Sequence, residues 1–184
     1  MADLKQLAEY CLPAASVGAA AGLVAGGLAA FVGQPIGWAV LTGLGLGVPL
    51  MVFGSGYAVL VALGKVPAGV FAPAAVYWVV AFPLSLMVHA IVTEWVVAGT
   101  PGLPPEPWKF LAFRALLSMG FAIGFLWMHE QIARLWWPRI LDHNEYARRT
   151  TGQYTRLAVA LEARKAASGR GHTRGRARTN RRPA

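Results

Sequence analysis

The chain has 184 residues, 56% of them hydrophobic, and a formal net charge of +9. Soluble domains contain about 45–50% apolar residues, so this composition argues against an ordinary soluble domain. A single cysteine, Cys11, excludes an intrachain disulfide. Residues 1–137 contain five basic and five acidic side chains, whereas residues 138–184 contain twelve basic and three acidic ones. All of the net charge therefore lies in the C-terminal quarter of the chain.

The longest uncharged stretch runs from Tyr10 to Gly64, and its 55 residues are enough for two membrane crossings of about 20 residues each. Residues 1–12 precede the first crossing and contain Asp3 and Glu9, so they lack the basic start of a signal peptide. We therefore interpret them as a cytoplasmic lead-in to an uncleaved membrane domain.

The first predicted span covers residues 13–32 and has a small residue at every fourth position. These residues are Ala14, Gly18, Gly22, Gly26 and Ala30. The spacing places them on one face of a helix, where a second helix can approach closely. We predict a helix-packing face. Its central glycines form an association face between chains in the leading interpretation, and in the alternative they only pack the bundle internally.

The second predicted span covers residues 38–63 and is interrupted by several glycines and by Pro49. Such a sequence favours a kinked or partly unwound helix, which a membrane tolerates only where protein or water covers the freed backbone groups. A broken helix that lines a binding site, as in transporters, is one interpretation. A kink that fits a neighbouring helix is the other, and we favour it.

The third and fourth predicted spans cover residues 70–97 and 108–137, and a loop rich in proline and glycine separates them. Glu94 and Arg114 lie at similar depths from this loop, within about one helical turn. Because a charged group buried in a membrane is costly unless it is paired, we predict an ion pair between them.

Near the other end of the fourth span, His129 and Glu130 form a possible ion or proton site, and we expect Glu130 to pair with Arg134 at i, i+4 spacing. His89 and His129 are offset by about 15 Å along the membrane normal in this arrangement, too far apart to ligate one haem. The sequence contains no metal-ligand run, nucleophile triad or phosphate-binding glycine loop. We therefore predict no catalytic residue, cofactor or metal.

Residues 138–167 favour a cytoplasmic helix that starts near Asp142 or Asn144 as its cap. A simple solvated helix is the first interpretation, and a helix on the bilayer surface or against a partner is the second. Residues 168–184 form a tail without acidic side chains, which we predict to be disordered. Its arginines are Arg170, Arg174, Arg176, Arg178, Arg181 and Arg182.

Three partners suit this basic tail. Anionic lipid headgroups come first, because clusters of basic residues beside a membrane segment bind them. An acidic face of a partner protein is the second. Nucleic acid is the third, although the tail lacks the aromatic residues on which bases stack.

The predicted fold is all-α: an antiparallel bundle of four transmembrane helices with a cytoplasmic amphipathic helix and a disordered basic tail. The basic C-terminal segment places both termini in the cytoplasm, in a multi-pass inner or plasma membrane protein. The abundance of arginine, alanine and glycine suggests a bacterial source.

The leading functional hypothesis is a non-enzymatic accessory or assembly subunit, or a self-associating scaffold, with other membrane chains or further copies of itself as partners. A small oligomeric transporter, pore or holin-like channel is the alternative. A membrane anchor for nucleic acid, for example in DNA transfer, is a weaker one.

Overall fold

The computed structural model describes residues 2–156, 158–160 and 162–163, and within them the chain is all-helical. The four long helices are α1 (Ala2–Phe31), α2 (Ile36–Ala62), α3 (Phe71–Ala98) and α4 (Pro107–Ile140). Each has the length and apolar composition to cross a membrane. A fifth helix begins at residue 145 and continues through residue 156. The predicted all-helical class with four long apolar helices is confirmed.

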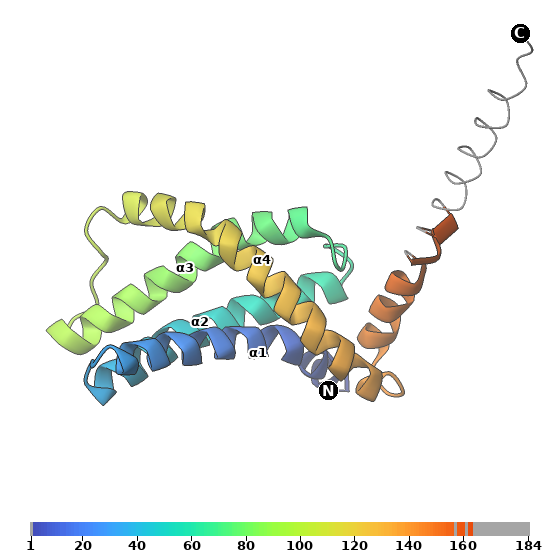
Figure 1. Ribbon diagram of the computed structural model, residues 1–184, viewed down its shortest axis with the longest axis horizontal. Helices are drawn as coiled ribbons and strands as arrows, with labels where there is room; N and C mark the ends of the chain where they lie inside the picture. The colour runs from blue at the N-terminus through green and yellow to red at the C-terminus, as the bar shows by residue number, and fades with distance from the viewer. Residues whose placement is uncertain (1, 157, 161, 164–184) are drawn as a thin grey trace, which may run out of the picture.

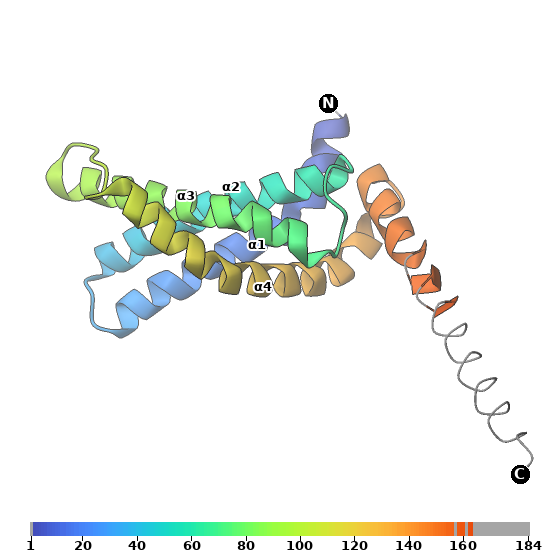
Figure 2. The same cartoon turned by 90° about the horizontal axis from the view of Figure 1, so that it is seen from above.

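The long helices form two hairpins, α1–α2 and α3–α4 (Figure 1). Helix α2 packs against α1 and α3, and α4 packs against α3 and α1. The two hairpins diverge toward the ends that carry their connecting loops (Figure 2). The chain begins at the opposite end, where the fifth helix also lies (Figures 1 and 2).

Helix α1 begins at Ala2, so the residues expected to form a separate lead-in are the first turns of the same helix. Pro13 lies inside it and has no N–H for the carbonyl of Glu9, one turn earlier. The indole Nε1–H of Trp136 donates to that carbonyl at 2.8 Å. A side chain of α4 thus replaces the backbone donor that proline removes, and the helix continues.

Helix α4 continues past Pro138 to Ile140, so the expected end at residue 137 is wrong. Helix α2 is helical throughout from Ile36 to Ala62 despite Pro49, so the partly unwound form is not observed. The glycines of α2 lie where a neighbouring helix or side chain approaches the α2 backbone closely. Gly54 contacts Ala14, and Gly45 leaves space for the ring of His89. Packing therefore stabilises a helix that its composition alone disfavours.

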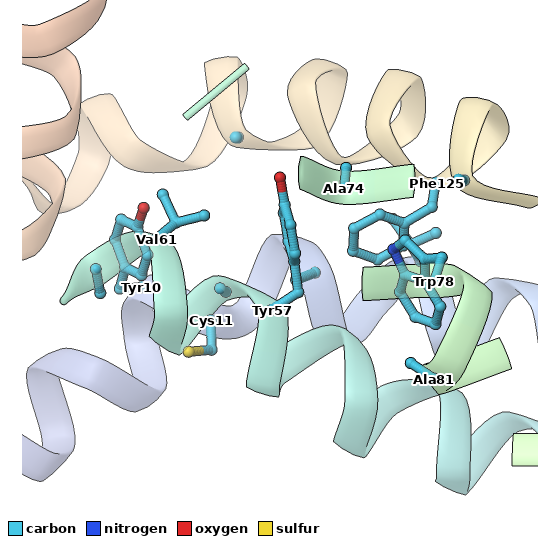
Figure 3. Close-up of a cluster of buried hydrophobic side chains, with 14 of the residues drawn as sticks. Tyr10, Cys11, Tyr57, Val61, Ala74, Trp78, Ala81 and Phe125 are labelled. Atoms are coloured by element: carbon cyan, nitrogen blue, oxygen red, sulfur yellow. The ribbon is translucent and has the colours of Figure 1, made fainter. Parts of the chain in front are cut away.

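Aromatic rings form the centre of the molecule. Trp78 of α3 lies between Phe121 and Phe125 of α4, with ring centroids 4.7 and 4.5 Å apart. Tyr57 of α2 meets the edge of Phe125 at 5.6 Å, and Tyr10 lies beside Val61 in the direction of the chain's start (Figure 3). Each such ring buries about 150–250 Å² of surface, so a few of them form much of the core.

Candidate functional site

The small-residue face of α1 lies against α2. A Cβ added at Gly22 would lie 2.5 Å from the carbonyl oxygen of Gly43, and one added at Gly18 would lie 2.3 Å from the backbone nitrogen of Met51. Gly26 is similarly close to the carbonyl of Ala39, at 2.7 Å. Only glycine permits this approach, because any side chain would overlap the facing backbone.

Because α2 of the same chain covers these central glycines, the stripe packs the α1–α2 hairpin internally, and the interpretation as an association face between chains is wrong. Ala14, at one end of the stripe, is fully buried against α2, whereas Ala30 at the other end is exposed. The glycines of α2 supply the complementary small surface, which single-helix spacing does not reveal.

Glu130 of α4 lies at the end of the bundle that carries the chain's start, and Tyr154 of the fifth helix reaches it. The Tyr154 hydroxyl donates a hydrogen bond to Oε1 of Glu130. The same ring packs against Gly69 in the α2–α3 loop, where an added Cβ would lie 2.9 Å from Tyr154 Cε1. Gly69 has a φ of 69°, a conformation that glycine adopts without strain.

The predicted local pair of Glu130 with Arg134 is absent. The ion pairs among the described residues are Lys109–Glu106, His143–Glu9 and Arg149–Glu145. Arg134 is exposed on α4, whereas Glu130 is half-buried and turned toward the fifth helix. Burial raises the pKa of the Tyr154 hydroxyl, and the hydrogen bond to Glu130 and the charge of Glu130 raise it further.

His129 is buried beside this contact, with its ring stacked on Phe125 at 5.8 Å and its edge toward Trp137. Neither ring nitrogen has a hydrogen-bond partner among the described residues. The gap between His129, Glu130, Trp137 and Tyr154 leaves no room for a water molecule. His129 is thus packed away from water, whereas Glu130 also lines an open cavity of about 460 Å³ between α4 and the fifth helix.

The fifth helix is fixed to the body of the chain at several further points. Asn144 caps its start by accepting from the N–H of Ala147 at 3.1 Å, as expected, and its amide donates to the carbonyl of Gln6 at 2.6 Å. The hydroxyls of Tyr10 and Thr150 lie 3.0 Å apart. The helix therefore docks on its own chain, which corrects the interpretation of a simple solvated helix.

The second polar site lies at the end of the α3–α4 hairpin that carries its loop. It is a cavity of about 480 Å³, which we call the α3–α4 pocket. Its lining includes His89, Thr93 and Glu94 of α3, Leu103 of the loop, and Phe110 and Arg114 of α4.

Glu94 and Arg114 both line this pocket, but the ion pair predicted between them is not formed. The guanidinium carbon of Arg114 lies 3.6 Å from the centre of the Phe110 ring, one helical turn earlier. The Cγ of Glu94 lies against Gly102 of the loop. The Arg114 guanidinium is thus positioned by Phe110, and the Glu94 side chain is exposed beside the loop.

The Nδ1 of His89 and the hydroxyl of Thr93 are also buried without a partner among the described residues. Among the described residues, no three His, Cys, Asp or Glu side chains lie close enough together to hold a metal ion. The six tail arginines predicted as contacts, Arg170 through Arg182, lie outside the described residues.

Comparison with known proteins adds no relative: no protein-family model, no curated protein sequence and no solved structure matches the chain.

Proposed function

We propose that this chain is a non-enzymatic membrane component that associates with a second copy of itself, as a scaffold within a multi-pass membrane assembly. The observation that carries the proposal is a free small-residue face on α4. Gly120 and Gly124 are exposed there, and a Cβ added at either would meet no atom within 4 Å. The glycine face of α1 differs, because it is already covered by α2.

The α4 face has the composition of a helix-pairing surface in a membrane. Leu116, Ile123 and Trp127 are exposed and lie on the same side of the helix as the two glycines. Lipid tails are as apolar as these side chains, so pairing depends on close backbone approach, which glycine allows. Glycine within a helix costs about 1 kcal/mol relative to alanine, and no contact within the described chain offsets that cost.

A second copy fits this face because the same surface on both chains is self-complementary about a two-fold axis. The expected arrangement is an antiparallel four-helix bundle in an inner or plasma membrane, with both termini in the cytoplasm. The basic segment after residue 138 supports that orientation. In this orientation we expect the basic tail to contact anionic lipid headgroups. If the chain is instead an accessory subunit, a different membrane protein would bind to the same α4 face.

The test is the native mass of the purified chain in a mild detergent, for the wild type and for two variants. We expect the wild type to be a dimer and Gly120→Leu with Gly124→Leu to be a monomer. Gly27→Leu is the matched control, since Gly27 is also an exposed helical glycine with open space around it. It should remain a dimer. A double variant that keeps the wild-type mass would contradict the proposal.

A further inference from the structure

The α3–α4 pocket holds one negative and one positive side chain that neutralise no other group in the described chain. Glu94 and Arg114 both line it, and neither takes part in an ion pair or hydrogen bond there. Two opposite charges that share a pocket without pairing are complementary to a ligand that carries both charges itself.

The guanidinium of Arg114 is oriented for such a ligand. One face of it lies over the Phe110 ring, so the cation–π contact fixes the plane of the group. Stacking uses the face and leaves the N–H edge free, and that edge matches the oxygens of a phosphate in a two-bond geometry. Arg114 is therefore a suitable partner for a phosphate.

The other polar side chains of the lining contribute less. The Nδ1 of His89 lies against Gly45 of α2, where an added Cβ would lie 2.7 Å from it. The hydroxyl of Thr93 is buried and has no partner among the described residues. Glu94 and Arg114 are therefore the groups that a charged ligand in the pocket would meet.

The depth of the pocket agrees with a lipid headgroup. Helix α3 has 28 residues and is therefore about 42 Å long, whereas the hydrocarbon core of a bilayer is about 30 Å thick. Glu94 lies four residues before the end of α3 at Ala98, which places it near the headgroup layer. Leu86, Leu103 and Phe110 supply an apolar lining beside the charges.

We propose that the α3–α4 pocket binds a phosphate–ammonium zwitterion, with the phosphate on Arg114 and the ammonium on Glu94. A phospholipid with an ethanolamine headgroup is the ligand that fits the position of the pocket. Soluble phosphoethanolamine presents the same two charges. This inference is independent of association through α4, because the pocket and the glycine face are separate surfaces.

The experiment is native mass spectrometry of the delipidated full chain, titrated with phosphatidylethanolamine or phosphatidylglycerol of identical acyl chains. The wild type should bind the ethanolamine lipid about ten-fold more tightly than the glycerol lipid, which has no ammonium group. Arg114→Gln and Glu94→Gln should each weaken that binding about ten-fold. Glu94 is exposed, so its variant tests the proposal without disturbing the core.

Lys109→Gln and Glu106→Gln are the matched controls, because they remove the same charges from an exposed pair at the same end of α4. Both should bind the lipid as the wild type does. Equal binding of the two lipids by the wild type, or unchanged binding in both pocket variants, would overturn the proposal. Displacement of the lipid by equimolar phosphoethanolamine would identify the soluble zwitterion as the ligand, and displacement only at large excess would identify the lipid.

Discussion

The hydroxyl of Tyr154 donates a hydrogen bond to the carboxylate of Glu130, and this bond joins the fifth helix to α4 across 24 residues of chain. Tyr154 also packs on Gly69, so one side chain links the fifth helix, α4 and the α2–α3 loop. The fifth helix is thereby attached to the four long helices at a defined point.

Tyr154→Phe should lower the free energy of unfolding by about 1–3 kcal/mol, because it leaves the half-buried Glu130 carboxylate without its donor. Unfolding of the detergent-solubilised chain by denaturant measures the loss. Thr155→Val is the control, since the exposed Thr155 hydroxyl bonds only to the carbonyl of Thr151 in its own helix. Equal effects of the two variants would contradict a specific role for the Tyr154–Glu130 bond.

The same contact predicts a dependence of stability on alkaline pH. Burial, together with Glu130, raises the pKa of Tyr154 in the folded chain above its unfolded value of about 10. Below pH of about 10 both states keep the proton, so the contribution is complete. Above it the unfolded chain loses the proton first, and the stability difference between wild type and Tyr154→Phe should shrink. A difference that grows with pH would contradict this assignment.

The two kinds of glycine in α1 should respond in opposite ways to alanine. Gly22→Ala places a methyl group 2.5 Å from the backbone of α2 and should cost about 1–3 kcal/mol through overpacking. Gly27→Ala meets no neighbouring atom and should stabilise by up to about 1 kcal/mol through helix propensity. Thermal unfolding of the two variants compares them directly. Equal shifts would show that α1 and α2 are not in close contact.

Glu94→Ala and Arg114→Ala should have additive effects on stability in lipid-free detergent. The two side chains share a pocket but form no ion pair, so the double variant should match the sum of the single ones within about 0.5 kcal/mol. A coupling energy above about 1 kcal/mol would show that the pair predicted from sequence forms after all.

The number and class of the helices are readable from the sequence, because long apolar runs separated by glycine and proline have few structural solutions in a membrane. Whether each helix continues through its prolines cannot be read from the sequence. Pro13 suggests a helix start, and only the indole of Trp136, which replaces the missing donor on the Glu9 carbonyl, explains why α1 continues through it.

The polar sites show a similar division. Helical depth correctly brings Glu94 and Arg114 to one pocket, but it does not reveal that Phe110 holds the guanidinium. Glu130 and Arg134 have the spacing of a local pair, whereas the actual partner, Tyr154, lies on another helix with no periodic relation to Glu130. Contacts between elements far apart in sequence leave no signal in the spacing of a single helix.

The measurement that tests the central proposal most directly is cysteine crosslinking in native membranes. Cys11 is replaced by alanine, and a single cysteine is introduced as Gly124→Cys or, for comparison, as Gly27→Cys. Association through α4 predicts that mild oxidation converts the Gly124→Cys chain into a covalent dimer of twice 19.6 kDa and leaves the Gly27→Cys chain monomeric. Absence of the Gly124→Cys dimer, or equal crosslinking at both positions, would contradict the account.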